Sequence, residues 1–285
     1  MKKDNTGYDI KNLFCGSEGT LGIISKILFK VYPKPNDYFH CFFGFKSTID
    51  TINFFKELRF FFNDDLESAE IIPEIAFEIT IKKKFLKINF FDKPCESYLL
   101  CKFTINQNKK EFQNILIIKL NKFNNKYKNV IIPQSIEQEN KFWKFRDSLV
   151  ESYKLEGKYI TNDISLPIDK LDEFINTATL EINKLIPGTR IYSFGHLGDG
   201  NIHFNMIEPY KFNKDFDKYR NKIYNIVNDL VFKNKGSFSA EHGIGMIKRN
   251  SLIKYKSKNE IDFMIKIKKI FDPKNILNPN KLLSL

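Results

Sequence analysis

Three of the four histidines of this chain lie in two short glycine-rich runs, residues 195–203 and 240–245. The first run holds His196 and His203, and the second holds Glu241 next to the third histidine. Two imidazoles and one carboxylate that leave coordination positions open form a common binding site for a divalent metal. A lone histidine is more often a hydrogen-bonded structural residue, but this concentration of histidines favours a site. We therefore expect His196, His203 and Glu241 to bind one metal ion.

A β-hairpin is predicted around the first run. Residues 190–194 and 202–206 have the composition of strands, and a Gly-Asp-Gly turn lies between them. A tight hairpin would place His196 and His203 at the same end of two paired strands. The second run would have to come alongside to add its carboxylate.

The composition is that of a globular chain with a sizeable core. The chain has 285 residues, of which 42% are apolar and 15% aromatic. No apolar run reaches the ~20 residues that a membrane span needs, and the first residues lack the apolar stretch of a secretory signal. The four cysteines match no zinc-binding spacing, so isolated thiols in a reducing compartment are expected. We expect a cytoplasmic protein, with the mitochondrial matrix as the alternative.

The net charge of +12 does not predict binding to nucleic acid. Only five of the 46 basic residues are arginine, and the lysines are spread along the chain. Nucleic-acid sites usually use arginine forks in clustered patches. The abundance of Lys, Asn, Ile and Phe indicates instead a compositional bias of the source genome. We therefore expect no nucleic-acid partner.

The middle of the chain repeats one order of strands and helices. In its first half, strands are expected at residues 38–45, 67–72, 97–105 and 127–132, with helices at 48–61 and 109–123. In its second half, strands are expected at residues 159–166, 190–194, 202–206 and 237–240, with helices at 169–185 and 212–235. Each half then has the β-α-β-β-α-β order of a ferredoxin-like unit. The predicted fold class is α+β: two such units form one antiparallel sheet covered by helices on one face.

A helix that carries the only tryptophan is expected between the two units, at residues 140–147. Two interpretations of its Arg146 stay open. The helix is a core anchor with Arg146 on its outer surface, or Arg146 points into the site and holds a carboxylate with two parallel hydrogen bonds.

The first 35 residues contain a turn rich in small residues, at 12–22, and an apolar strand is expected after it, at 23–32. Backbone N–H groups of small residues can approach a phosphate or a planar ring closely. A plain turn between two elements fits this stretch equally well. The Pro-Lys-Pro sequence at residues 33–35 predicts the end of the segment.

These motifs together resemble one protein family. The runs at 195–203 and 241–245, with the tail motif at 272–279, are similar to the C-terminal half of the FAD-linked 2-hydroxy-acid dehydrogenases. That family includes D-lactate dehydrogenase, the flavin subunit of glycolate oxidase and D-2-hydroxyglutarate dehydrogenase. Residues 7–22 resemble the last part of the family's FAD-binding domain, so that domain's last fragment is expected at the start of the fold.

The resemblance implies roles for individual residues. It places Zn²⁺ or a similar divalent ion on His196, His203 and Glu241, and it makes His242 the catalytic base. Substrate contacts are implied for Arg146 and Asn201, and flavin contacts for Ser17, Glu18, Gly19, Gly22 and Asn278. The implied reaction is the FAD-dependent, metal-assisted oxidation of a D-2-hydroxy acid, resembling lactate or 2-hydroxyglutarate, to the 2-oxo acid.

The identity of the hydroxy acid stays open. The helix at 143–146, followed by the motif at 163–167, is most similar to D-2-hydroxyglutarate dehydrogenase. Those enzymes have a substrate-binding Lys two residues before the Asp of that motif, where this chain has Thr161. A second carboxylate on the substrate would therefore lose one partner.

The expected domains are a C-terminal remnant of the FAD-binding domain at residues 1–35 and a substrate and metal domain with a flavin-side tail at residues 36–285. Most of the family's FAD-binding region has no counterpart in the sequence. We therefore expect a separate FAD-binding subunit or split-gene partner to bind most of the FAD. A homodimer and the nature of the electron acceptor stay open. The alternative function is a non-catalytic, metal-binding remnant or scaffold subunit.

Overall fold

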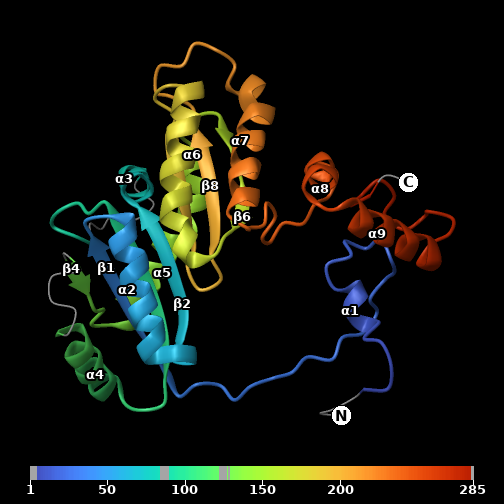
Figure 1. Cartoon of the computed structure of the whole chain (residues 1–285). Helices are drawn as coiled ribbons and strands as arrows, with labels where there is room; N and C mark the ends of the chain where they lie inside the picture. The colour runs from blue at the N-terminus through green and yellow to red at the C-terminus, as the bar shows by residue number, and fades with distance from the viewer. Residues whose placement is uncertain (1–4, 84–89, 122–126, 128, 284–285) are drawn as a thin grey trace. The chain divides into compact units, whose positions relative to one another are not determined.

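The computed structural model describes residues 5–83, 90–121, 127 and 129–283. The chain forms two compact units (Figure 1). Unit 1 combines residues 1–32 with residues 241–285, and unit 2 contains residues 33–240.

The described residues of unit 2 form one antiparallel sheet of eight strands. The strands are β1 (Asp37–Phe45), β2 (Leu66–Pro73), β3 (Ser97–Ile105), β4 (Asn129–Ile131), β5 (Tyr159–Ile160), β6 (Asp163–Ser165), β7 (Arg190–His196) and β8 (Asn201–Ile207). Their order across the sheet is β4-β1-β3-β2-β7-β8-β5, and β6 also pairs with β8. The central strands β2 and β7 join the two halves through the residue pairs Glu70–His196 and Ile71–Gly195.

The two halves of the sheet repeat the same topology, as the sequence predicts. From the centre outward, the first half runs β2-β3-β1-β4, and the second runs β7-β8-β6 and then Ser237. The strand expected at residues 237–240 is wrong, because only a bridge from Ser237 to Ser165 is formed. The Ser237 hydroxyl donates to the carbonyl oxygen of Ser239 and accepts from its N–H. Such local bonds compete with a strand ladder and turn the chain.

Among the described residues, four helices cover one face of the sheet (Figure 1). They are α2 (Thr48–Phe62), α4 (Lys109–Asn121), α6 (Leu171–Leu185) and α7 (Arg220–Lys233). Helix α2 begins where the Ser47 side chain accepts a hydrogen bond from the N–H of Asp50, as a helix N-terminus requires. The apolar side chains of the four helices pack on Phe43, Phe103 and Phe204 of the strands in one hydrophobic core.

Two further helices, α3 (Glu74–Lys82) and α5 (Ile136–Lys154), cover part of the opposite face. The expectation of helices on one face only is therefore wrong. Neighbouring strand residues such as Phe42 and Phe43 point to opposite faces and are both fully buried, so both faces need a cover. Helix α3 was not predicted because its sequence contains several β-branched residues, which favour strands.

The helices of unit 1 are α1 (Lys11–Phe14), α8 (Arg249–Tyr255) and α9 (Lys258–Phe271). Helix α9 begins with a capping box, in which Ser257 and Glu260 each bond the other's backbone. Near its end, the buried Lys268 donates to the carbonyl oxygens of Thr20 (2.8 Å) and Leu277 (2.9 Å). Lys268 thereby joins the N-terminal turn to the C-terminal tail.

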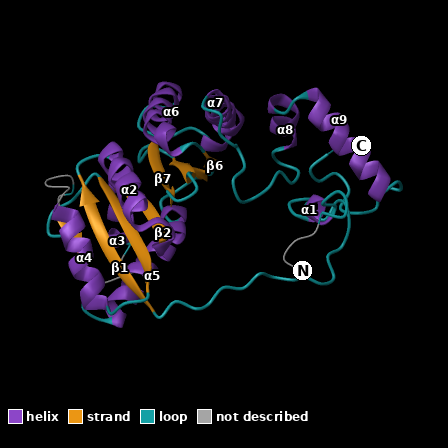
Figure 2. Ribbon diagram, turned by 60° about the horizontal axis from the view of Figure 1, so that its bottom comes forward, coloured by secondary structure: helices purple, strands orange, loops and turns teal. Residues whose placement is uncertain are grey.

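The strand expected at residues 23–32 is wrong, because this stretch is a long loop (Figure 2). Its apolar side chains are exposed, among them Ile23 (87%) and Leu28 (96%). A strand needs a neighbouring strand to bond its backbone, and the described part of unit 1 contains none. The domains expected at residues 1–35 and 36–285 remain predictions.

Among the helices of the described residues, none combines the length and the apolar character needed to cross a membrane.

Candidate functional site

The hairpin of β7 and β8 brings together the two histidines of the first glycine-rich run. In its register His196 lies opposite Asn201, and Phe194 lies opposite His203. His196 and His203 therefore point to the same face of the sheet, the one that α3 and α5 partly cover. Their ring centroids are 5.7 Å apart. The predicted hairpin, with both histidines at one end, is confirmed.

Two glycines allow the strands and the turn to approach this closely. A Cβ atom at Gly195 would collide with the carbonyl oxygen of Asn201 on the paired strand. Gly200 has a φ of +73°, and a Cβ atom there would collide with the carbonyl oxygen of Leu166. Any side chain at these two positions would move the strands that carry the histidines.

Glu70 of β2 reaches the first histidine from the neighbouring strand. Its Oε1 lies 2.7 Å from Nδ1 of His196, and the residue is only 4% exposed. Burial by itself raises the pKa of the Glu70 carboxyl. The hydrogen bond with His196 and the positive charge of Arg146 lower that pKa by more, so it lies below its usual range. Glu70 thus forms a buried ion pair with Arg146.

Arg146 of α5 lies against the same histidine. Its Nε donates to Oε2 of Glu70 at 3.1 Å. Its terminal NH2 nitrogen is 3.2 Å from Nε2 and 3.5 Å from Nδ1 of His196. An atom on the axis of one ring lone pair would be much farther from the other ring nitrogen, so the guanidinium lies over the face of the imidazole. Of the two interpretations left open by the sequence, the structure has Arg146 turned inward beside His196.

The second histidine also has a buried carboxylate beside it. Asp163 of β6 lies opposite His203 of β8, with 3.7 Å between Oδ1 and the Nδ1 of His203. The Asn201 amide nitrogen donates to Asp163 Oδ1 and to the carbonyl oxygen of Ile164, each at 2.9 Å. These two acceptors determine which way the amide points. The Asn201 amide oxygen is buried and meets no hydrogen-bond donor among the described residues.

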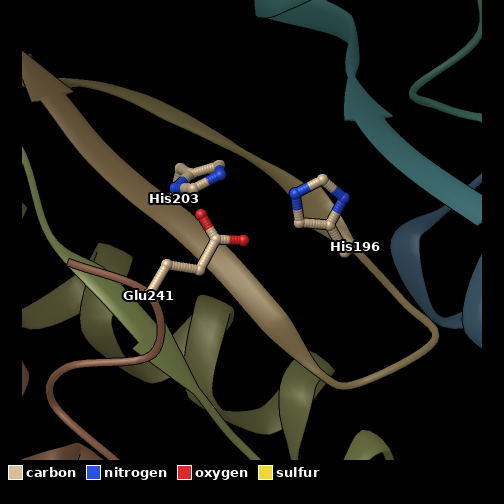
Figure 3. Close-up of side chains that lie close together, drawn as sticks. All are labelled: His196, His203 and Glu241. Carbon is tan, nitrogen blue, oxygen red and sulfur yellow. The ribbon is translucent and has the colours of Figure 1, made fainter. Parts of the chain in front are cut away.

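The predicted third metal ligand, Glu241, follows Ala240 directly, and the N–H of Ala240 donates to the carbonyl oxygen of Asp163. His196, His203 and Glu241 each offer one ligand atom, and these atoms all lie within 4.8 Å of one another. Figure 3 shows the carboxylate of Glu241 directed toward the space between the two imidazoles. One ring nitrogen of His196 faces that space and the other faces away (Figure 3). Metal binding by these three residues remains a prediction.

In unit 1, the N-terminal turn meets the second glycine-rich run. The Glu18 carboxylate accepts hydrogen bonds from the backbone N–H groups of Ile244 (2.6 Å) and Gly245 (2.8 Å). The Asn278 amide donates to the carbonyl oxygen of Glu18 at 2.6 Å. His242 lies two residues before Ile244 and is exposed.

The other predicted flavin contacts lie in the same turn. The Ser17 hydroxyl donates to the carbonyl oxygen of Phe14, and Gly22 lies against the Phe14 ring. Gly19 lies next to the Asn278 amide. The side chains of Ser17 and Glu18 thus bond the backbone of this chain, and the flavin contacts of all five residues remain predictions.

Sequence reasoning missed Glu70 as a member of this site. One signal was present: residues 69–72 read Ala-Glu-Ile-Ile, and a single acid inside an apolar strand indicates a buried charge with a partner. Its partners, His196 and Arg146, are 126 and 76 residues away in the chain, which no local pattern shows.

Comparison with known proteins finds relatives over nearly the whole chain. D-2-hydroxyglutarate dehydrogenase, mitochondrial, from Arabidopsis thaliana is 31% identical over 290 residues, which cover 99% of this chain and 50% of that protein. D-2-hydroxyglutarate dehydrogenase from Stutzerimonas stutzeri is 30% identical over 285 residues, covering 98% of this chain and 60% of that protein. The chain therefore spans about half the length of the curated relatives that it matches.

Solved structures and a family match agree with these relatives. The structure of p-cresol methylhydroxylase with substrate bound matches 99% of this chain and 59% of that chain, with a TM-score of 0.72 and 13% identity, so the two share a fold. The family described as FAD linked oxidases, C-terminal domain, matches residues 40–282. This match covers most of the chain, and it agrees with the motifs at 195–203 and 241–245. The chain therefore belongs to the family of FAD linked oxidases, C-terminal domain.

Proposed function

We propose that this chain is the substrate- and metal-binding part of an enzyme that oxidises a D-2-hydroxy acid to the 2-oxo acid with FAD. The observation that carries the proposal is the group of His196, His203 and Glu241, with the guanidinium of Arg146 against His196. Matched relatives named D-2-hydroxyglutarate dehydrogenase support this class of substrate.

The donor set suits a divalent ion such as Zn²⁺. Two imidazoles and one carboxylate leave one position of a tetrahedral site for substrate. In a tetrahedral site with zinc–ligand bonds of about 2.0–2.2 Å, neighbouring ligand atoms lie about 3.3–3.6 Å apart. Ligand atoms within 4.8 Å of one another would therefore have to approach by about 1 Å to hold one ion, which side-chain rotations can supply. Bound there, the ion would lower the pKa of a substrate hydroxyl as a Lewis acid.

Two side chains next to the histidines can bind the carboxylate and the hydroxyl group of the substrate. Because Glu70 accepts from the Nε of Arg146, the two terminal nitrogens of the guanidinium are the pair that can hold a carboxylate in two parallel hydrogen bonds. The buried amide oxygen of Asn201 can accept a hydrogen bond from a substrate hydroxyl. This would offset the ~1–3 kcal/mol cost of leaving a buried acceptor unsatisfied.

His242 is the proposed base, which takes the proton of the 2-hydroxyl group. FAD would supply the redox chemistry by accepting the hydride from C2 of the substrate. The proposed flavin contacts are Ser17, Glu18, Gly19, Gly22 and Asn278. Because Ser17 and Glu18 use their side chains within the chain, we propose that this turn meets the flavin through backbone groups.

The test is an activity assay with the FAD-binding region of a matched relative added to this chain. Reduction of an artificial electron acceptor is followed with D-2-hydroxyglutarate, D-lactate and their L-enantiomers. We expect oxidation of a D-acid only, loss of activity after treatment with a chelator, and recovery with Zn²⁺. A preparation that holds flavin and metal but oxidises none of these acids would contradict the proposal. It would favour a non-catalytic scaffold.

The same preparation tests the proposed partners. Size-exclusion chromatography with light scattering shows whether the chain binds a separate FAD-binding polypeptide or pairs with a second copy. The electron acceptor is found by comparing natural acceptors in the same assay. The cytoplasmic location stays a prediction, whereas the Arabidopsis relative is named as mitochondrial.

A further inference from the structure

We propose that Glu70 is a positioning residue that holds His196 in the tautomer needed to bind a metal. This inference rests on the proposed metal site but concerns residues within unit 2. Glu70 and His196 are directly paired across β2 and β7. The Glu70 carboxylate is therefore placed by the backbone of the sheet beside a proposed metal ligand.

The direction of the hydrogen bond follows from the chemistry of the two groups. Among the described residues, two donors bond the Glu70 carboxylate, Arg146 Nε at 3.1 Å and the Ser68 hydroxyl at 3.3 Å, and His196 Nδ1 lies 2.7 Å from it. A carboxylate paired with the permanently charged guanidinium of Arg146 has no hydrogen to donate. Nδ1 of His196 must therefore carry the proton, and in the neutral ring Nε2 then carries the lone pair.

The lone pair on Nε2 has the direction that a metal ligand requires. Figure 3 shows one nitrogen of His196 directed toward His203 and Glu241 and the other directed away from them. Because Nδ1 faces Glu70 on the neighbouring strand, the nitrogen on the metal side is Nε2. Arg146 lies over the ring face, so it braces the imidazole without lying on the axis of this lone pair.

The contact between Asp163 Oδ1 and Nδ1 of the second histidine is longer than the one between Glu70 and His196. Asp163 is also buried and lies opposite His203, but the distance from its Oδ1 to Nδ1 is 3.7 Å, beyond a hydrogen bond. That oxygen accepts instead from the Asn201 amide at 2.9 Å. The proposal is therefore based on the 2.7 Å contact between Glu70 Oε1 and His196 Nδ1.

The first experiment measures the tautomer without any metal. Two-bond ¹⁵N–¹H correlation spectra of the chelator-treated chain at alkaline pH distinguish Nδ1–H from Nε2–H imidazoles, and a His196→Gln variant assigns the signal. We expect the Nδ1–H form in the wild-type chain. In Glu70→Gln the side-chain amide can donate to Nδ1, so the signal should move toward the Nε2–H form. An Nε2–H imidazole in the wild-type chain would overturn the proposal.

The second experiment measures the affinity for Zn²⁺ by competition with a chromophoric chelator. Loss of a carboxylate behind a metal-binding histidine typically weakens metal affinity about 10–100-fold, which is the change expected for Glu70→Gln. Glu70→Asp keeps a charged acceptor and should bind Zn²⁺ more tightly than Glu70→Gln. The matched control is Glu67→Gln on the same strand, whose carboxylate bonds Lys102 and should leave the affinity unchanged.

The two readouts separate this proposal from the proposed function. Should the wild-type chain bind no Zn²⁺ while its His196 tautomer depends on Glu70, the metal site fails and the role of Glu70 stands. A folded Glu70→Gln variant, checked by circular dichroism, with wild-type tautomer and wild-type Zn²⁺ affinity would refute the role of Glu70. If Glu70→Gln does not fold, the tautomer of the wild-type chain and the behaviour of Glu70→Asp still decide the question.

Discussion

The carboxylate of Glu18 accepts a hydrogen bond from the backbone N–H of Ile244, 226 residues later in the chain. The next N–H, of Gly245, donates to the other oxygen of the same carboxylate. These bonds tie the N-terminal turn to the run that holds His242, the proposed base. Glu18 was expected to contact flavin, and in the structure its charged group holds this loop.

The first prediction concerns this loop. In Glu18→Gln, the backbone amides of Ile244 and Gly245 should exchange with solvent deuterium about tenfold faster or more. The reason is that hydrogen bonds to a charged group contribute about 1.5–3 kcal/mol, more than those to a neutral amide. Amide exchange followed by NMR or mass spectrometry measures the effect. The control is Asp9→Asn, which removes an exposed carboxylate of the same unit, and equal exchange in both variants would show that Glu18 does not hold the loop.

The second prediction concerns metal content. The wild-type chain, purified with Zn²⁺ and dialysed, should retain about one equivalent, whereas His203→Ala should retain far less, since one of three protein ligands is lost. His242→Ala is the matched control, because it removes the histidine next to Glu241 and leaves the three proposed ligands unchanged. Elemental analysis gives both values. Equal metal content in the wild-type chain and His203→Ala would rule out this ligand set.

The third prediction separates the base from the substrate anchor in the enzyme supplied with its FAD-binding region. His242→Ala should lower kcat by about 10²–10⁴, because a base acts only as the proton moves. Arg146→Lys should mainly raise KM, because Arg146 would hold the carboxylate equally in the ground state and the transition state. Metal content is measured for both variants first. A folded, metal-loaded His242→Ala enzyme with normal kcat would show that another group is the base.

A buried ion-pair group in unit 2, separate from the histidines, makes the stability of the fold depend on pH. Glu156 pairs with Arg190 at 2.5 Å and with Lys83 at 2.8 Å, and the Glu156 side chain is only 8% exposed. Burial alone raises the pKa of Glu156, but the bonds to Lys83 and Arg190 lower it by more, so the net shift is downward. A carboxyl whose folded-state pKa is depressed stabilises the fold above its unfolded pKa of about 4.3. That stabilisation is lost as the pH falls through the lower folded-state value.

The fourth prediction follows from the lowered pKa of Glu156. Glu156→Gln should lower the free energy of unfolding near neutral pH by about 3–5 kcal/mol, because it leaves Arg190 without its buried partner. The difference between wild-type and variant chains should shrink as the pH falls below about 4. Urea unfolding at a series of pH values measures both curves. A constant difference at all pH values would mean that the charge of Glu156 does not stabilise the fold.

The repeated topology of unit 2 and the hairpin with His196 and His203 could be predicted from the sequence. Both depend on local signals: the period of apolar residues differs between strands and helices, and a short glycine-rich turn joins neighbouring strands. The ligand set could be proposed for the same reason, since its two histidines and its one acid all lie in two short runs of sequence. The apolar composition of residues 23–32 predicted a strand that does not form, because a strand needs a partner strand to bond its backbone.

The surroundings of the histidines were decided by tertiary structure. Glu70 meets the hairpin because the two halves of the sheet pair through β2 and β7, and Arg146 of α5 bonds Glu70 there. Asp163 meets it because β6 pairs with β8. Tertiary structure also decides the partner of Glu18, whose carboxylate accepts a hydrogen bond from the N–H of Ile244, most of the chain length away in sequence. A carboxylate's partner depends on distances in space of a few ångströms, and these are set by strand register and helix packing rather than by neighbouring residues in sequence.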